Sequence, residues 1–248
     1  MVEIEGFRLF VMGNDYIGRE ILASGSYEPH VTAVVKRVLK AGSTFLDIGA
    51  NLGYFSLLAS RLVGATGKVM CFEPNPQNQQ LIYSSMLENH VENVRVFPYA
   101  ASDAAGILKF ATVGSNGGVV TSEAKNQRHH FLVPSVVLDE VLKEEESIDL
   151  VKIDVEAHEP AVLKGMAGLL KRNRSRIIVE FHPWALQLAN LAPPEELLQQ
   201  LSSFGYSLTI IEPTGNCLRA LSSREILDYW KSLGCETVHL DLLAEPCE

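Results

Sequence analysis

Short apolar runs alternate with longer amphipathic stretches along most of the chain. Runs of strand length, rich in Val, Ile, Leu and Phe, predict strands at 44–48, 68–72, 94–99, 148–153, 176–181 and 206–211. Stretches in which apolar residues recur every three or four positions predict helices at 54–62, 77–88, 139–142, 160–170 and 194–204. This alternation is typical of an α/β fold with a mostly parallel sheet, right-handed crossovers and helices on both faces.

The two ends of the chain add smaller elements. Before residue 40, the pattern predicts a hairpin at 7–15, a loop through Ser24-Gly25-Ser26, and a helix at 28–39. We assign residues 1–40 to the same domain as residues 41–248, because no clear linker separates them. A last strand near 236–240 brings the predicted sheet to seven strands, and we expect that strand to run antiparallel.

One polar segment interrupts the alternation. Residues 114–130 are rich in Gly, Asn and Ser and lie between two short β-like runs at 107–112 and 131–133. Such composition is typical of loops that carry function, so we expect a mobile segment over an acceptor pocket, ordered by substrate. His129 and His130 fall in this segment, and a plain surface position is the simpler interpretation of both.

Composition and charge narrow the functions that such a fold could serve. Of the 248 residues, 47% are hydrophobic and 21% charged, which is ordinary for a globular protein. The net charge of −9 argues against nucleic-acid binding. No apolar run approaches the roughly 18 residues of a membrane span, and the acidic N-terminus lacks a signal peptide. Four scattered cysteines fit reduced thiols, so we expect a cytoplasmic protein.

The turn after the first strand carries the clearest chemical signal. It reads Asp-x-Gly-x-x-x-Gly, with Asp47, Gly49, Asn51 and Gly53 in order. Glycines let a backbone approach a ligand, but a dinucleotide turn has a different glycine spacing and aims a helix at a pyrophosphate. A carboxylate at the turn suits a ligand with a cationic amino-acid group and no phosphate, which describes S-adenosylmethionine. A nicotinamide dehydrogenase is disfavoured.

Polar residues also follow the second and third strands. Glu73 ends the second strand, where an acid can accept hydrogen bonds from the two hydroxyls of a ribose. Asn75 either lines an adenosine pocket or caps the next helix. After the third strand, Ser102 and Asp103 could reach an adenine amino group, or could cap a turn. We assign all four residues to cofactor binding.

The strand at 148–153 runs into a second polar cluster, Asp154-Val155-Glu156-Ala157-His158-Glu159. Ligands of open α/β sheets bind at this edge, so we expect Asp154 between the cofactor's sulfonium end and the acceptor. Glu156 or Glu159 would anchor the helix and the substrate. Lys152 could offset the repulsion between these carboxylates.

The following strand ends in Glu180 and His182. A histidine has the pKa that suits removing a proton from a hydroxyl near neutral pH, so His182 is a candidate base beside Asp154 and Glu156. A structural role for a lone histidine is the alternative. His30, His90 and His239 have no local context that suggests a function.

These motifs resemble the FkbM-type family of S-adenosylmethionine-dependent methyltransferases, within the Rossmann-like class I methyltransferases. The resemblance spans roughly residues 40–185 and rests on the motifs at 45–56, 72–76, 101–103, 138–139 and 152–159. One departure is Ala157, where the family usually has glycine. The resemblance implies methyl transfer, typically to a hydroxyl of a sugar or secondary metabolite.

Several alternatives remain open from the sequence. Asp154 and Glu180 could hold Mg²⁺ in a metal-assisted O-methyltransferase, although we assign no metal ligands. The chain could also bind its cofactor without turnover. Nucleic-acid N-methylation is less favoured, because an Asn/Asp-Pro-Pro-Tyr/Phe motif is lacking. We expect a small-molecule hydroxyl acceptor and neither nucleic acid nor membrane as partner, and we leave a homodimer open.

Overall fold

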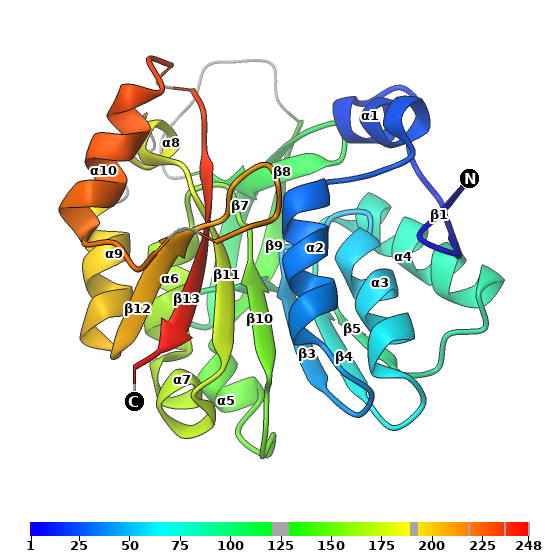
Figure 1. Cartoon of the computed structure of the whole chain (residues 1–248). Helices are drawn as coiled ribbons and strands as arrows, with labels where there is room; N and C mark the ends of the chain where they lie inside the picture. The colour runs from blue at the N-terminus through cyan, green and yellow to red at the C-terminus, as the bar shows by residue number, and fades with distance from the viewer. Residues whose placement is uncertain (121–128, 189–192, 218, 236, 248) are drawn as a thin grey trace.

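The computed structural model describes residues 1–120, 129–188, 193–217, 219–235 and 237–247. Its centre is a seven-stranded sheet in the order β12-β13-β11-β10-β3-β4-β5 (Figure 1). The strands are β3 (Thr44–Ile48), β4 (Lys68–Phe72), β5 (Val94–Phe97), β10 (Leu150–Ile153), β11 (Arg176–Phe181), β12 (Tyr206–Ile210) and β13 (Leu240–Pro246). The five adjacent strands β11, β10, β3, β4 and β5 run parallel to one another, whereas β13 runs antiparallel to both β11 and β12. The predicted α/β class, mostly parallel sheet and antiparallel last strand are confirmed.

Helices cover both faces of this sheet, as predicted. One face packs against α1 (Tyr16–Ser24), α2 (Pro29–Val38), α3 (Tyr54–Val63) and α4 (Pro76–Glu88). The other packs against α5 (Leu138–Val141), α6 (Glu159–Gly165), α7 (Ala167–Asn173), α8 (Pro183–Leu188), α9 (Pro194–Ser203) and α10 (Ser223–Ser232). Along β3, Phe45 joins the first core and Leu46 the second, because successive strand residues point to opposite faces.

The first 40 residues pack into the first of these cores, but their elements differ from the prediction. The hairpin consists of β1 (Val2–Ile4) and β2 (Phe7–Leu9), and residues 16–24 form α1. The predicted second hairpin strand at 12–15 is therefore wrong, and the predicted loop through Ser24-Gly25-Ser26 begins only where α1 ends at Ser24. The reason is a helix cap: the Asp15 carboxylate accepts a hydrogen bond of 2.6 Å from the backbone N–H of Gly18.

Other boundaries in the second half of the chain also shift. The predicted helix at 160–170 is two helices, α6 and α7, which meet at Met166. The last strand begins at Leu240, later than expected. Helices α8 and α10 were not predicted, although α10 begins with a readable capping box between Ser222 and Glu225.

A second sheet of four strands lies beside the main one, in the order β6-β9-β7-β8. Its strands are β6 (Ala100–Ala101), β7 (Gly106–Val113), β8 (Asn116–Val119) and β9 (His129–Val136). The segment 114–130 thus begins with a turn and β8. Its residues 121–128 lie outside the described residues, and its mobility stays a prediction.

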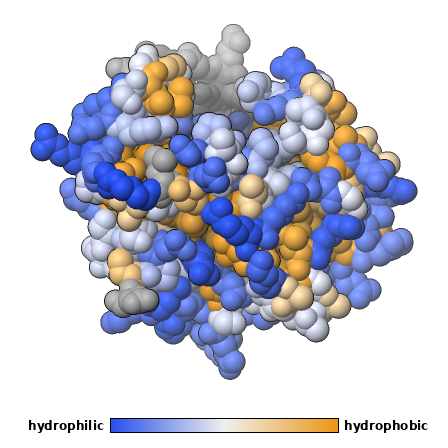
Figure 2. All heavy atoms as spheres, viewed as in Figure 1, coloured by the Kyte–Doolittle hydropathy of each residue, from blue (hydrophilic) through white to orange (hydrophobic). Residues whose placement is uncertain are grey.

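The surface seen in Figure 2 is largely hydrophilic, with smaller hydrophobic areas between the polar side chains. Within the described ranges, no helix is both long and apolar enough to cross a membrane.

Candidate functional site

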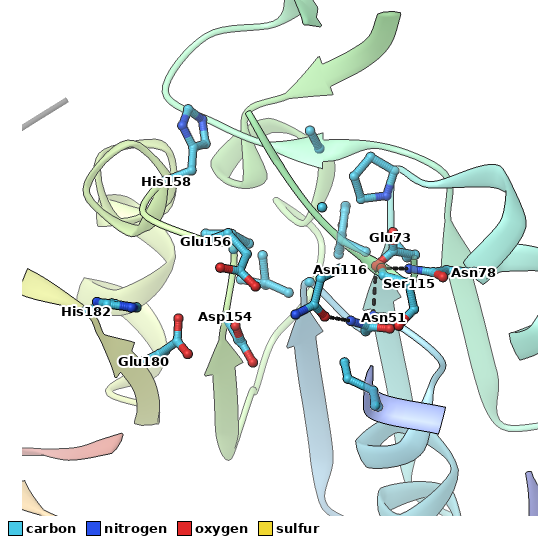
Figure 3. A pocket seen from close by; sticks show the side chains of 18 of the residues that line it. Asn51, Glu73, Asn78, Ser115, Asn116, Asp154, Glu156, His158, Glu180 and His182 are labelled. Carbon is cyan, nitrogen blue, oxygen red and sulfur yellow. Dashed lines mark hydrogen bonds between the residues drawn. The ribbon is translucent and has the colours of Figure 1, made fainter. Parts of the chain in front are cut away.

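A cavity of about 420 Å³ opens at the carboxyl ends of the parallel strands. Gly49, Glu73, Asp154 and Glu180 reach it from the ends of four neighbouring strands, β3, β4, β10 and β11. Figure 3 shows Glu73, Asn51 and Asn78 on one side of the cavity, and Asp154, Glu180 and His182 on the other. The topology therefore brings polar residues that are far apart in sequence to one sheet edge, as in other open α/β sheets.

The turn after β3 is shaped by close backbone packing. Gly49 has a φ of 84°, and a Cβ there would lie 1.8 Å from the Asp154 carbonyl oxygen, so a side chain cannot fit. Gly53, the residue before α3, has the same φ and packs against Ile82 of α4. Gly49 and Asn51 line the cavity, whereas Gly53 is not among the lining residues.

Asp47 supports this turn from beneath. The residue is 1% exposed and lies within β3, outside the residues that line the cavity. Its carboxylate accepts a hydrogen bond of 2.6 Å from Ser56 Oγ, which ties β3 to α3. Burial raises the pKa of Asp47 to about 6, and the charge of Lys152 acts against that rise.

Glu73 lies at the cavity wall and is fixed by two backbone N–H groups. The N–H of Asn51 donates to Oε2 and the N–H of Asn75 donates to Oε1, each at 2.8 Å. The residue is 4% exposed, and burial raises its pKa to about 8. Each carboxylate oxygen keeps a second lone pair, so Glu73 can accept two further hydrogen bonds from a ligand.

The other residues predicted to bind the adenosine do not line the cavity. Asn75 caps α4, since its side-chain oxygen accepts from Gln77 N at 3.1 Å. Ser102 Oγ lies 3.0 Å from His158 Nε2 and 3.3 Å from a carboxylate oxygen of Asp103. None of Asn75, Ser102 and Asp103 is among the lining residues, and their cofactor roles stay predictions.

Lys152 is the buried cation beneath the cavity. Its Nζ lies 2.7 Å from Asp154 Oδ2, 3.8 Å from Glu28 Oε2 and 4.7 Å from the centre of the Phe55 ring. Burial lowers the pKa of Lys152, but the charges of Asp154, Glu28 and Asp47 outweigh it and raise the pKa above its usual range. The expected offset of carboxylate charge by Lys152 is therefore confirmed.

Three of the residues that line the cavity have a left-handed backbone although they are not glycines. These are Glu28, Asn51 and Glu156, with φ of 40°, 50° and 55°. Such strain collects at functional sites, where the surrounding structure enforces it. Glu28 was missed by the sequence reasoning, because an acid before a proline gives no signal beyond a helix start.

The turn after β10 contains two left-handed residues in succession. Ala157 follows Glu156 with a φ of 74°, a conformation that favours glycine and accounts for the family's usual residue there. Glu159 holds this turn, because its Oε1 accepts from Val155 N at 3.0 Å. Of the two predicted candidates, Glu159 therefore ties the start of α6 to this turn, and the anchoring of a substrate stays a prediction. Burial raises the pKa of Glu159 to about 8.

A group of histidines and acids lies at the end of the cavity away from Glu73. His30 Nε2 is 2.7 Å from Asp241 Oδ2, and His239 Nδ1 is 3.5 Å from Glu180 Oε1. The rings of His182 and His239 have centres 6.2 Å apart. Burial lowers the pKa of His182 and raises that of Glu180 well above its usual range. His30 and His239, which had no context in the sequence, thus belong to the same site as His182.

The turn between β7 and β8 closes over the cavity. Three side chains hold it: Asp15 Oδ2 accepts from Ser115 N at 3.0 Å, Asn78 Nδ2 donates to Ser115 O at 2.9 Å, and Asn51 Nδ2 donates to Asn116 Oδ1 at 3.0 Å. The last of these bonds is drawn in Figure 3. Helix α1 and β8, both missed by the sequence reasoning, therefore form part of the site.

The residues of the cavity can be compared with what an adenosine and what a metal ion would each require. The buried Asn78 Oδ1 has no hydrogen-bond partner within the described ranges, and Glu73 beside it has free acceptor capacity. Such acceptors fit the hydroxyl and amino donors of an adenosine. In the part of the chain that the structure describes, no group of three or more His, Cys, Asp or Glu side chains could hold a metal ion.

Two characterised relatives are similar over part of the chain. AMB antimetabolite synthetase AmbE of Pseudomonas aeruginosa is 28% identical over 185 residues, 58% of this chain and 9% of that protein. Hexuronic acid methyltransferase AglP of Haloferax volcanii is 28% identical over 143 residues, 55% of this chain and 54% of that protein. The chain therefore spans less than two thirds of either relative.

Solved structures share the fold at low sequence identity. The methyltransferase FkbM of Methylobacillus flagellatus has a TM-score of 0.51 and 14% identity, covering 82% of this chain and 44% of that one. The precorrin-6y C5,15-methyltransferase of Geobacter metallireducens has the same TM-score and identity, covering 99% and 97%. These similarities confirm the predicted class I methyltransferase fold.

The sequence model of the methyltransferase FkbM domain matches residues 47–208, more than half of the 248 residues. The match begins at Asp47 and includes Glu73, Asp154 and His182. The chain belongs to the FkbM family of S-adenosylmethionine-dependent methyltransferase domains.

Proposed function

We propose that the chain transfers the methyl group of S-adenosylmethionine to a hydroxyl of a small molecule, of the sugar or secondary-metabolite class. The observation that supports this most is the division of one cavity into two ends. Glu73 and Asn78 offer hydrogen-bond acceptors at one end, and His182 and Glu180 lie at the other. His30 belongs to this second end, because it contacts Asp241, which pairs with Glu180 across two strands. Such a cavity suits a cofactor and an acceptor bound side by side.

The first end has the groups that an adenosine requires. Glu73 would accept hydrogen bonds from the two ribose hydroxyls, because its orientation is already fixed by two backbone N–H groups. The backbone at Gly49 and the side chain of Asn51 would border the rest of the cofactor. When bound, the cofactor supplies a methyl group on a positively charged sulfur, and the surrounding carboxylates favour that charge.

Asp154 lies on the side of Glu180 and follows β10, the strand beside the one that leads to Gly49. Lys152 fixes its carboxylate at 2.7 Å, and Gly49 packs against its backbone carbonyl. We assign it the positioning of methyl donor and acceptor, with Glu156 beside it at the cavity wall. Methyl transfer needs in-line geometry above all, so small errors of placement are costly.

Two observations support the proposed class of acceptor, the activity of one relative and the volume of the cavity. The Haloferax volcanii relative is a hexuronic acid methyltransferase, which favours a sugar hydroxyl. A volume of about 420 Å³ suits small molecules, and the net charge of −9 opposes nucleic acid. A cytoplasmic location and a homodimer remain further expectations of this proposal.

Calorimetry with S-adenosylhomocysteine, followed by a screen with methyl-labelled cofactor and a panel of sugar glycosides, tests the proposal. We expect binding heat and label transfer to at least one sugar. Binding without transfer to any metabolite would favour the alternative of a cofactor-binding protein without turnover. Loss of transfer in EDTA, restored by Mg²⁺, would favour the metal-assisted alternative.

The role of Asp154 gives a sharper test of the same proposal. We expect Asp154→Asn to lower kcat about a hundredfold, because the neutral amide loses its charge-assisted bond from Lys152 and its fixed orientation. Affinity for S-adenosylhomocysteine reports whether the cavity is intact. A near-wild-type kcat in this variant would mean that the reaction centre lies elsewhere.

A further inference from the structure

We infer that His30, oriented by Asp241, is the general base that takes the proton from the acceptor hydroxyl. This inference rests on the proposed function, and it assigns a catalytic residue that the sequence motifs do not contain. The two residues are separated by 211 positions, and the fold alone brings them together at the acceptor end of the cavity.

Both partners are held by regular structure. His30 is the second residue of α2, two positions after the left-handed Glu28 that precedes the helix. Asp241 is the second residue of β13 and pairs in register with Glu180 of β11. Asp241 is 7% exposed, so its carboxylate has little access to water.

The contact between them determines which ring nitrogen is basic. Nε2 of His30 lies 2.7 Å from Asp241 Oδ2, and a carboxylate can only accept, so Nε2 carries a proton. In the neutral ring, Nδ1 is therefore the atom that can take another proton. Within the described part of the chain, no hydrogen bond involves this nitrogen. The His30 side chain is 23% exposed and lines the cavity, so a ligand and water can reach it.

His182 is the competing candidate and has a different environment. Its Nδ1 accepts a long contact of 3.4 Å from Ala185 N, and it has no carboxylate partner within the described ranges. Burial and the neighbouring His239 lower its pKa. A histidine that stays neutral beside the site suits contact with the acceptor, whereas a carboxylate-bound histidine is better able to hold a proton.

The charged groups that act on His30 are Asp241, Glu28 and Lys152, and His239 and Glu180 lie beside Asp241. Asp241 lies in β13, and His239 lies directly before that strand. Glu180 lies in β11 and Lys152 in β10, and Glu28 is the residue before α2. The hydrogen bond to Asp241 raises the pKa of His30, burial and Lys152 act against it, and Glu28 acts with it.

The proton and electron balance of the step is simple. The acceptor oxygen forms a bond to the methyl carbon, the carbon–sulfur bond breaks, and its electron pair stays on sulfur, which becomes neutral. The hydroxyl proton moves to Nδ1 of His30, and Asp241 stabilises the resulting imidazolium. The proton then leaves to water through the exposed side of the ring.

The test compares His30→Gln, Asp241→Asn and His182→Gln with a control, His90→Asn, on the exposed surface away from the cavity. The probes are labelled S-adenosylmethionine and the sugar glycoside that the wild-type chain methylates fastest in the panel above. We expect kcat to fall about a hundredfold in His30→Gln and at least tenfold in Asp241→Asn, within the range for a lost general base. S-adenosylhomocysteine affinity should change less than about twofold in both, because neither residue lies at the cofactor end.

A second readout does not depend on turnover. NMR titration of the histidine rings should give His30 a pKa above its usual 6.5 in the wild-type chain, and Asp241→Asn should lower it. The acidic limb of the pH profile of kcat should shift to lower pH in the same variant. A matching shift in both measurements would link the dyad to the reaction rather than to folding.

Three results would overturn the inference. These are wild-type kcat in His30→Gln, an unchanged acidic limb in Asp241→Asn, or an acidic limb lost only in His182→Gln. Failure of the proposed function gives a different result, because the wild-type chain would then methylate no glycoside. In that case His30 would have no catalytic role in this reaction. The NMR titration would still show whether Asp241 raises the pKa of His30.

Discussion

Buried carboxylates dominate the cavity at the scale of single residues. Burial raises the pKa of Glu28 to about 7, of Glu73 to about 8, and that of Glu180 well above its usual value. Each therefore gains more from an opposite charge or a donor than an exposed acid would. A cationic ligand with several hydroxyl and amino donors would supply both an opposite charge and hydrogen-bond donors. Its binding would therefore stabilise the ionised forms of these buried acids.

Glu73 provides the first prediction at this scale. Glu73→Ala should weaken S-adenosylhomocysteine binding by about 1–3 kcal/mol, because buried ribose hydroxyls would lose a hydrogen-bonding carboxyl group. Isothermal calorimetry measures the loss, with the exposed Glu92→Ala as the matched control. Equal affinity in wild type and Glu73→Ala would place the ribose elsewhere.

Ala157 provides the second prediction at the scale of single residues. Its φ of 74° is costly for any residue with a Cβ, so Ala157→Gly should raise the stability of the folded chain by about 1 kcal/mol. The gain is reduced because glycine also adds freedom to the unfolded chain. Urea unfolding measures the change. A less stable glycine variant would show that the methyl packing of this 3% exposed residue outweighs its strain.

The connection between helix α1 and the β7–β8 turn matters most at the scale of elements. Asp15 serves both, since Oδ1 caps α1 through Gly18 and Oδ2 holds the turn through Ser115. Gly114 permits this contact, because a Cβ there would lie 2.7 Å from Asp15 Cβ. A single carboxylate thus joins the N-terminal helix to the turn that covers the cavity.

Removal of that carboxylate should loosen both elements. Asp15→Ala should lower stability by about 1–2 kcal/mol, the usual cost of a lost helix cap, and should speed amide exchange at residues 113–117. Mass spectrometry of hydrogen exchange measures this, with peptides from β3 as the internal reference. Unchanged exchange at the turn would show that Asn51 and Asn78 hold it without Asp15.

Stability against pH is a property of the whole molecule. Burial raises the pKa of Asp47 from 3.8 to about 6, and those of Glu73 and Glu159 from 4.5 to about 8. The folded chain therefore binds more protons than the unfolded chain between about pH 4 and pH 8. The stability that these acids contribute at low pH is lost as the pH rises through 6 to 8.

Urea unfolding of the ligand-free chain should show the effect as lower stability at pH 8.5 than at pH 5.5. Glu159→Gln should reduce the difference, because the amide keeps an acceptor for Val155 N without a charge to bury. Equal pH dependence in this variant and wild type would exclude Glu159 as a source of the effect.

The sequence predicted the central strands and the polar residues at their ends. β3, β4, β10 and β11 are apolar runs buried on both faces, which gives a strong local signal. Helix α1 gave a weaker signal, an N-cap at Asp15 and two buried apolar residues four positions apart, Ile17 and Ile21. The pairing of His30 with Asp241 depends on the sheet order, and local pattern carries no information about it.

The sheet order also has a consequence for how the chain is made. Strand β12 is synthesised before β13, yet within the seven-stranded sheet it pairs only with β13, which inserts between it and β11. On the ribosome, the cofactor end could form from residues up to His182 while β11 still presents an open edge. Asp241 arrives with that last strand. If His30 is the base, as we propose, a chain that lacks β13 has no His30–Asp241 pair, and methyl transfer should begin only when synthesis of the sheet is complete.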